Sequence, residues 1–423
     1  IVIAIISLVI TTMNAIAAPT IRLMTSGHVP NLEMPKECNY HVFMSHVWAT
    51  GKSKTHSISR KLQLLLPRLK VWLDVDSLEY IGKLEESVAE SAVFVLYYSK
   101  GYFRSENCRR ELYAAVGMDK PIMVIYEGDD TVLQDLRNEC SANCMEEPGF
   151  EYILEHLFKN DPIRWLHEGP FCAAAMNRIY TCLLTRLPYY QQNRNIHLLE
   201  QGLTVPGELS PVSLPGPLTV LVCNANTGAL QVAEEIQAML PLRGTIKIRT
   251  IENVKSILPK SIETPPDDIE GMMDDDLSHD DASLQGLEEL NEDDNLSTTE
   301  EPENERRQSV AEYDLSIEDI PQGSPPSTLL LYLNMDVFLD EGDTVTGIVQ
   351  AAKDLKIDIV LVHEQDSQEG GCEFSQFFKQ TPQILIDNPY ELYHEMATPL
   401  HTRSEYRIVS LRKIVLRLGQ VDE

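Results

Sequence analysis

The first 190 residues alternate between short apolar runs and longer segments in which apolar residues recur with helical spacing. The apolar runs predict strands over residues 40–45, 70–75, 93–99 and 121–127. The segments between them predict helices over 56–67 and 81–92, and a helix that opens at Ser105. Residues 152–188 are expected to be helical, and 171–187 are apolar on nearly all sides, which indicates burial. Strands and helices in alternation are typical of an open parallel sheet with helices on both faces, so we expect an α/β fold.

The second half of the chain repeats this outline. Residues 62–67 (LQLLLP) resemble 236–241 (IQAMLP), and 93–103 (VFVLYYSKGYF) resemble 328–338 (TLLLYLNMDVF). The run IMVIYEGDD is echoed in the same way by IVLVHEQDS. The first two offsets, 174 and 235 residues, differ by 61, which is about the length of the stretch 257–326. The pattern therefore predicts a second, diverged α/β domain that is interrupted by an insertion.

The insertion carries most of the charge of the chain. Between Glu263 and Asp319 there are 22 acidic residues and two arginines, which contribute −20 to a net charge of −30. This segment has too few apolar groups to offset the entropy of ordering, so we expect it to be disordered. So acidic a chain is not expected to bind nucleic acid, because phosphates would be repelled. The sequence RRQS makes Ser309 a candidate phosphorylation site.

Residues 1–18 form an uncharged apolar run without an initiating Met. The run is slightly shorter than the roughly 20 residues that span a bilayer. We expect it to be the end of a transmembrane helix in a chain that starts inside a longer protein. A signal peptide that ends at AIA is the alternative, although it lacks a positive n-region. Basic residues after the run predict that residues 19–423 are cytoplasmic: Arg22, Lys36, Lys52, Lys54, Arg60 and Lys61.

The eight cysteines show no regular spacing, and several lie in apolar runs. In a chain of 423 residues this is typical of reduced intracellular thiols rather than of a disulfide framework. Cys140 and Cys144 have the spacing of two ligands on one helix, but no second pair follows them, and we expect no metal site.

Two polar loops after predicted strands are candidate binding sites. Residues 49–53 (ATGKS) stand where a phosphate-binding loop would, but His46 occupies the position of the first glycine of that motif. We therefore expect a polar loop with a glycine turn there. Asp74, Asp76 and Glu79 follow the second strand, at the edge of the sheet where α/β proteins bind ligands. Asp74 could orient a ribose or an inter-domain contact, or it could cap a helix or form an Asx turn.

Glu111 is the third candidate. In the segment FRSENCRREL, a helix that begins after Ser105 would align Cys108, Glu111, Leu112 and Ala115 on one apolar face. A carboxylate in such a stripe costs free energy unless it is paired, hydrogen-bonded or protonated. An ion pair with Arg60, Arg104, Arg109 or Arg110, or hydrogen bonds to a neighbouring loop, would satisfy it structurally. The alternative is a catalytic role.

The blocks HVFMSH, KVWLDVDSLEYIG, VFVLYYSKGYFRSENCRREL and KPIMVIYE resemble, in order and spacing, the first part of a TIR (Toll/interleukin-1 receptor) domain. The resemblance covers residues 39–130, with 150–188 as the closing helical part, and is strongest to TIR modules that follow the last membrane span of large membrane proteins. It implies a flavodoxin-like sheet and a BB loop that contains Asp76, Leu78, Ile81 and Gly82.

TIR domains associate with one another in signalling, and some hydrolyse NAD with a glutamate that aligns with Glu111. Nicotinamide leaves as a neutral group, so that a buried carboxylate need only stabilise the oxocarbenium-like ribose. The resemblance therefore implies Glu111 as the catalytic residue and NAD as a possible substrate, with no cofactor. Residues that would surround the substrate are Ser45, His46, Trp48, Asp74, Asn107 and Cys108. In the second half, Glu111 maps to residues 346–348, where no carboxylate stands.

The expected organisation is therefore a membrane segment (1–18), a juxtamembrane linker (19–38), a TIR domain (39–190), a linker (191–216) and a degenerate TIR-like domain (217–423). We expect a membrane-tethered signalling protein that works by TIR–TIR association, self-association included. NAD hydrolysis by Glu111 is the alternative function.

Overall fold

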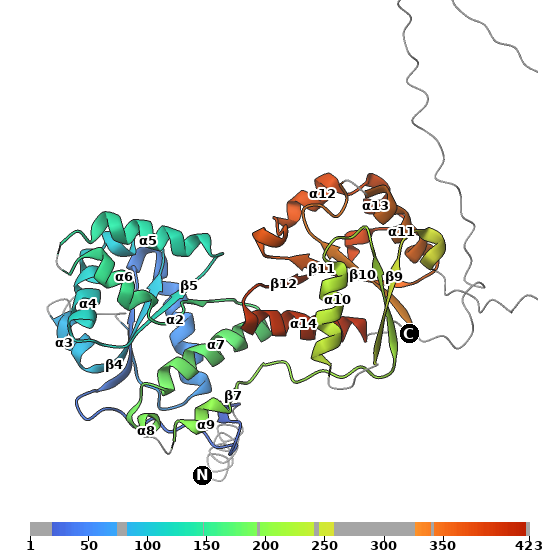
Figure 1. Cartoon of the computed structure of the whole chain (residues 1–423). Helices are drawn as coiled ribbons and strands as arrows, with labels where there is room; N and C mark the ends of the chain where they lie inside the picture. Colours follow the sequence, from blue (N-terminus) through green and yellow to red (C-terminus); the bar gives the residue numbers. More distant parts are fainter. Residues whose placement is uncertain are drawn as a thin grey trace, which may run out of the picture. The chain divides into compact units, whose positions relative to one another are not determined.

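The computed structural model describes residues 19–73, 83–146, 148–192, 195–240, 245–257, 326–339 and 342–419. They form two compact units, shown in Figure 1. Unit 1 runs to Val212 and includes Leu400–Lys413, whereas unit 2 runs from Ser213 to Pro399 and includes the residues from Ile414 on. Within the described ranges, no helix is both long and apolar enough to cross a membrane. Several sequence predictions lie outside these ranges: the membrane segment 1–18, Asp74, the BB-loop residues, Ser309 and the acidic insertion.

Unit 1 is an α/β domain built on a five-stranded sheet. Its strands are β2 (Tyr40–Ser45), β3 (Val71–Leu73), β4 (Ser91–Tyr98), β5 (Ile122–Tyr126) and β6 (Ile163–Arg164). The longer helices are α2 (Trp48–Leu65), α3 (Leu84–Ala89), α4 (Glu106–Gly117), α5 (Thr131–Asn143), α6 (Phe150–Phe158) and α7 (Gly169–Leu184). Shorter elements are β1 (Arg22–Leu23), the 3₁₀ helix η2 (Tyr102–Arg104), α8 (Pro188–Gln191), α9 (His197–Glu200) and β7 (Leu203–Thr204).

The sheet has the order β3-β2-β4-β5-β6, and all four strand pairs are parallel. Strands β2 and β4 are therefore central, and they are buried along almost their whole length. This burial explains why both read as continuous apolar runs rather than as alternating ones. The predicted open parallel sheet with helices on both faces is confirmed.

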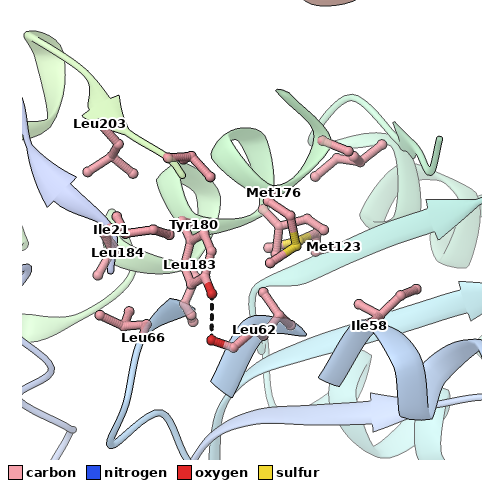
Figure 2. Close-up of a cluster of buried hydrophobic side chains, with 14 of the residues drawn as sticks. Ile21, Ile58, Leu62, Leu66, Met123, Met176, Tyr180, Leu183, Leu184 and Leu203 are labelled. Atoms are coloured by element: carbon pink, nitrogen blue, oxygen red, sulfur yellow. Dashed lines mark hydrogen bonds between the residues drawn. The ribbon is translucent and has the colours of Figure 1, made fainter. Parts of the chain in front are cut away.

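The side chains of each strand alternate between two cores. Val42 and Met44 of β2 belong to the core under α2 and α7, whereas Phe43 belongs to the core under α3 to α6. Figure 2 shows the first core, in which the hydroxyl of Tyr180 donates a hydrogen bond to the carbonyl of Leu62 at 2.5 Å. This bond satisfies a buried tyrosine hydroxyl. On the opposite face, Phe43 stacks on Trp72, with ring centroids 4.2 Å apart.

Three local predictions for unit 1 were wrong. Residues 49–53 are not a loop, because α2 already begins at Trp48. Their polar side chains lie on the exposed face of this helix, while Gly51 is buried. The helix predicted over 81–92 ends at Ala89 where it is described, and β4 begins two residues later. The segment 152–188 contains the short edge strand β6, which is too brief to leave a periodic signal.

The segments flanking the sheet are also ordered. β1 pairs antiparallel with β7, so residues from the expected linkers 19–38 and 191–216 join in a small two-stranded sheet. Ile21, Leu199 and Leu203 are buried in the core of unit 1. Residues 400–413 also cluster with unit 1, and Tyr406 and Val409 contribute to the same core.

Unit 2 is a second α/β domain with the same strand arrangement. Its sheet has the order β12-β11-β10-β8-β9, in which β8 to β11 are joined by parallel pairs. Equivalent strands in the two sheets are β2 and β8, β4 and β10, and β5 and β11. The sequence repeats single out the last two pairs, whereas the repeat of 62–67 and 236–241 lies at the ends of helices α2 and α10. The strands are β8 (Leu218–Cys223), β9 (Ile246–Ile251), β10 (Ser327–Leu333), β11 (Asp358–Glu364) and β12 (Thr398–Leu400).

The helices of unit 2 cover its sheet as short, separate pieces. They are α10 (Ala229–Met239), α11 (Gly342–Asp354), α12 (Phe377–Gln380) and α13 (Gln383–Ile386), with 3₁₀ turns η3 (Val254–Ile257), η5 (Ser367–Glu369), η6 (Phe374–Gln376) and η7 (Leu392–His394). The C-terminal helix α14 (Ser404–Leu418) follows β12. Figure 1 shows α11, α12 and α13 gathered on one side of this sheet, where Leu331, Val349 and Phe377 share a core.

Candidate functional site

The candidate site lies at the carboxyl end of β2, in the middle of the sheet of unit 1. Ser45 is the last residue of this strand and pairs in register with Leu96 of β4. His46 follows it, and both side chains are buried. Ligands of open α/β sheets bind at this edge. The position of the strand end therefore makes Ser45 and His46 neighbours of any ligand bound there.

Helix α4 brings Glu111 to this strand end. Its N-cap is Ser105, whose hydroxyl accepts a hydrogen bond from the backbone N–H of Cys108 at 3.4 Å. With this start, Cys108, Glu111, Leu112 and Ala115 are all buried, which confirms the predicted face of the helix. The cap thus fixes the rotation that turns a carboxylate into the protein interior.

Glu111 is only 6 % exposed, and its carboxylate is hydrogen-bonded. The hydroxyl of Ser45 donates to Oε2 of Glu111 at 2.5 Å and lies 2.6 Å from the hydroxyl of Tyr102. Because Ser45 has a single proton, which it gives to the carboxylate, Tyr102 must donate its own proton to Ser45. Glu111 has a further polar or electrostatic interaction in addition to this chain.

Burial keeps the groups around Glu111 in their neutral forms. Desolvation, helped by the nearby Cys108 and Glu111, raises the pKa of Tyr102 well above its usual value, so Tyr102 remains a donor. Burial and then the charge of Glu111 raise the pKa of Cys108 to about 12. Cys108 is therefore a thiol at neutral pH, and its Sγ donates to the carbonyl of His46 at 3.4 Å. A thiol in this state is a poor nucleophile.

His46 is held beside the start of α2. It is 4 % exposed, and burial lowers its pKa, so the ring is neutral near pH 7. Its Nδ1 lies 3.4 Å from the carbonyl of Met44, while Nε2 is buried and has no hydrogen-bond partner among the described residues. A side chain at Gly51 would come within 3.0 Å of Cβ of His46. The glycine therefore serves close packing inside a helix, rather than a phosphate-binding turn.

The other predicted site residues lie at the surface. Trp48 opens α2 and is 47 % exposed, with Nζ of Lys52 5.6 Å from the centre of its ring. Asn107 is exposed in the first turn of α4. The structure thus gathers Ser45, His46, Cys108 and Glu111 but places Trp48 and Asn107 outside the buried group; Asp74 lies outside the described residues.

The arginines considered as partners of Glu111 have other contacts. Arg110 forms an ion pair with Glu85 at 2.7 Å, and Arg109 donates to the carbonyl of Phe103 at 2.6 Å. Sequence spacing suggested both because they lie next to Glu111, but neighbours in a helix point about 100° apart. The structure shows that Glu111 accepts a hydrogen bond from Ser45 at the end of a strand.

Sequence reasoning missed two residues, Glu139 and Gly101, that position Tyr102. Glu139 of α5 accepts hydrogen bonds from the hydroxyl of Tyr98 at 3.1 Å and from the backbone N–H groups of Gly101 at 3.0 Å and Phe103 at 2.9 Å. Gly101 has φ +97°, a conformation that favours glycine. Nothing in the periodicity marks Glu139, because it lies 28 residues beyond Glu111 on another helix.

Unit 2 has a different buried carboxylate. Glu364 at the end of β11 accepts hydrogen bonds from the hydroxyl of Tyr332 and from the backbone N–H groups of Gln365 and Asp366, all at 2.7–2.8 Å. The position that aligns with Glu111 falls instead in α11, where Thr346 donates its hydroxyl to the carbonyl of Gly342. The two sheets therefore share an arrangement of strands but not the Ser45–Glu111 pair.

The cysteine, histidine and acidic side chains form no metal site among the described residues. All eight cysteines are free thiols. In the part of the chain that the structure describes, no three His, Cys, Asp or Glu side chains are grouped so that they could hold a metal ion.

Comparison with known proteins supports one family. No curated protein matches the chain significantly. The family model described as TIR domain matches residues 42–151, from the first strand of the sheet to the start of α6. The matched part includes Ser45, Tyr102 and Glu111 and reaches four of the five strands of the parallel sheet of unit 1. Residues 42–151 therefore match the TIR domain family, and the parallel α/β fold of unit 1 is consistent with a TIR domain.

Proposed function

We propose that this chain is a signalling protein that acts through association of its TIR domain with other TIR domains, including copies of itself. The match of residues 42–151 to the TIR family carries the proposal. The state of Glu111 supports it, because a carboxylate that is 6 % exposed and bonded to Ser45 already has a structural task. It ties α4 to the end of the central strand and so stabilises the sheet edge from which the BB loop departs.

The interface is proposed to include the BB-loop residues Asp76, Leu78, Ile81 and Gly82. Sedimentation velocity of the purified chain over a range of concentrations tests this idea. Ile81→Glu is expected to shift the distribution toward monomer. Leu64→Glu is the matched control, since Leu64 is 69 % exposed on α2, outside the predicted BB loop. If both variants assemble as the unaltered chain does, the BB loop is not the interface and this form of the proposal fails.

NAD hydrolysis is the second candidate function, and one observation favours it. The carboxylate of Glu111 lies at the carboxyl edge of the sheet, among groups that are neutral at pH 7. Low polarity there would strengthen its interaction with a positive ribose in the transition state. Ser45 would have to exchange its bond to Glu111 for a bond to a ribose hydroxyl, and nicotinamide would leave without a general acid.

Release of nicotinamide from NAD by the concentrated, purified chain tests this candidate. Glu111→Gln removes the charge and is expected to abolish release. Glu106→Gln is the control, because Glu106 is an exposed carboxylate in the first turn of the same helix. Equal rates for the two variants, or no release by the unaltered chain, would exclude an enzyme that depends on Glu111.

Attachment to a membrane is a further part of the proposal. Its basis is the uncharged apolar run of residues 1–18 and the basic residues that follow it. In this arrangement residues 19–423 would face the cytoplasm. Expression in cells followed by alkaline carbonate extraction is the test, with a chain that lacks residues 1–18 as control. Complete release of the full chain into the carbonate supernatant would rule out a spanning helix.

A further inference from the structure

A cavity of about 920 Å³ lies in unit 1 at the amino end of β2 and β3. It is at the other end of β2 from Ser45 and Glu111, and therefore separate from the candidate site described above. One wall is formed by segment 26–34, which precedes β2, and another by Tyr189, Tyr190 and Leu198 of the segment that contains α8 and α9. Its volume falls within the range of pockets that hold small organic ligands.

Hydrogen bonds to the framework hold the wall of segment 26–34 in place. His41, which is 2 % exposed, accepts a hydrogen bond on Nδ1 from the N–H of Lys70 at 2.9 Å. Its Nε2 must then carry the proton, and it donates to the carbonyl of Leu32 at 3.1 Å. The N–H of Asn31 donates to the hydroxyl of Tyr190 at 2.9 Å. Since two sites of the wall are anchored, the cavity does not depend on a free loop.

The lining combines apolar walls with a cationic rim. Apolar contacts are offered by Leu23, Val29, Pro30, Leu32, Met34 and Leu198. Arg68, Lys70 and His28 also line the cavity, and no Asp or Glu does. Arg68 and Lys70 are exposed, and neither forms an ion pair with any residue that the structure describes. The two cations are thus available to an anion from solution.

The backbone of Arg68 also has an unusual conformation. Its φ is +84°, in the left-handed region that side chains with a Cβ rarely adopt. Such a conformation costs free energy and is often found where a side chain must be aimed at a ligand. Glycine would relieve the strain at this position but would remove the guanidinium from the rim.

We propose that the cavity binds a small anionic amphiphile, an apolar chain that ends in a phosphate or carboxylate group. The chain lies against the apolar walls, and the head group pairs with Arg68 and Lys70. Arginine suits this role because its planar guanidinium can donate two parallel hydrogen bonds to one phosphate or carboxylate. This binding function is additional to TIR–TIR association and does not rest on it.

Isothermal titration calorimetry of the full chain with decyl phosphate tests the proposal, and decanol is the matched neutral ligand. We expect decyl phosphate to bind, with an affinity that falls as salt is added. Decanol should bind at least about tenfold more weakly, because it cannot form the charge-assisted hydrogen bonds. Arg68→Gln and Arg68→Gly should each lower the affinity for decyl phosphate about tenfold. The glycine variant guards against misfolding, because it relieves backbone strain. Arg104→Gln, in η2 near the opposite edge of the sheet, should bind as the unaltered chain does.

Vesicles distinguish a membrane lipid from a free ligand. The chain is mixed with phosphatidylcholine vesicles that contain phosphatidate, and Arg68→Gln is the control for attachment through other residues. Binding to vesicles that Arg68→Gln weakens identifies the ligand as a lipid head group, whereas Arg68-dependent binding of decyl phosphate alone identifies a free amphiphile. The proposal is overturned if neither probe binds, if decanol binds as well as decyl phosphate, or if the Arg68 variants bind like the unaltered chain.

Discussion

Replacement of Ser45 by alanine tests whether Glu111 serves as a structural tie. Ser45→Ala removes the hydroxyl that donates to Oε2 of Glu111 at 2.5 Å, and the same hydroxyl lies 2.6 Å from that of Tyr102. The loss therefore affects two buried partners at once. The volume change is small, so little of the effect should come from a cavity.

The expected loss of stability can be estimated from these contacts. A hydrogen bond to a charged group contributes about 1.5–3 kcal/mol, and leaving a buried hydroxyl such as that of Tyr102 without this acceptor costs about 1–3 kcal/mol. The two costs arise at one buried site, where the side chains can partly rearrange, so they are not fully additive. We therefore expect Ser45→Ala to lower the free energy of unfolding of unit 1 by about 2–4 kcal/mol. The coupling between Ser45→Ala and Glu111→Ala should be about 1.5–3 kcal/mol in a double-mutant cycle.

Tryptophan fluorescence during urea unfolding is a selective assay. The three tryptophans, Trp48, Trp72 and Trp165, all belong to unit 1, so the signal reports that unit alone. Ser99→Ala is the matched control. The hydroxyl of Ser99 lies 2.7 Å from that of Thr50 at the surface, where its loss should change stability by less than about 0.5 kcal/mol.

Two results would refute the structural role. One is a Ser45→Ala midpoint that differs from the unaltered chain by no more than the Ser99→Ala midpoint does. The other is a coupling energy near zero, which would mean that Ser45 and Glu111 do not depend on each other in solution. Either result would leave Glu111 as a carboxylate kept for a purpose other than stability.

Three further predictions follow from unit 1 and unit 2. Glu139→Ala removes the acceptor of three hydrogen bonds and should destabilise unit 1 by about 2–4 kcal/mol in the same fluorescence assay. Replacement of Glu155, an exposed residue of α6, by alanine should not. Burial lowers the pKa of His41 and of His46, so the unfolded state binds more protons, and the stability of unit 1 should fall as the pH drops below about 6.5. The free energy of unfolding changes by at most about 1.4 kcal/mol per pH unit for each histidine. His41→Gln should reduce this slope, whereas His197→Gln, at an exposed position, should not. Equal slopes in the unaltered chain and both variants would contradict the prediction. Gly228→Ala in unit 2 places a Cβ 2.6 Å from the ring of Tyr332 at φ +90° and should speed hydrogen exchange in β10, with a backbone cost of about 1–3 kcal/mol; unchanged exchange would show that the loop adapts.

The sequence predicted the buried face of α4 because it depends on local information. Ser105 caps the helix, and a 3.6-residue period from this start places Glu111 between Cys108 and Ala115. It did not predict the partner of Glu111. Arginines nearby in sequence were the obvious candidates, but the donor is Ser45, 66 residues away at the end of a strand.

The same distinction applies to the polar segment 49–53. Its composition is that of a loop, and only packing shows why it is helical. Gly51 has no side chain that would collide with His46, and the polar side chains of the segment face away from the sheet. The cavity beside Arg68 was equally hidden. It is made by segments near residues 30, 68 and 190, whose proximity no periodicity records.

The sequence by itself determined the α/β class, the order of apolar strands, the repeat of that pattern in unit 2, and the TIR resemblance. The first three follow from apolar spacing, because burial repeats with the period of each element, whereas the resemblance rests on four blocks of residues. Tertiary structure alone decided that Glu111 meets Ser45 and Tyr102, that His41 fixes the cavity wall, and that Arg68 has a strained backbone. Each of these contacts requires the angle and register between elements distant in sequence, and those are set by the packing of two cores against one sheet.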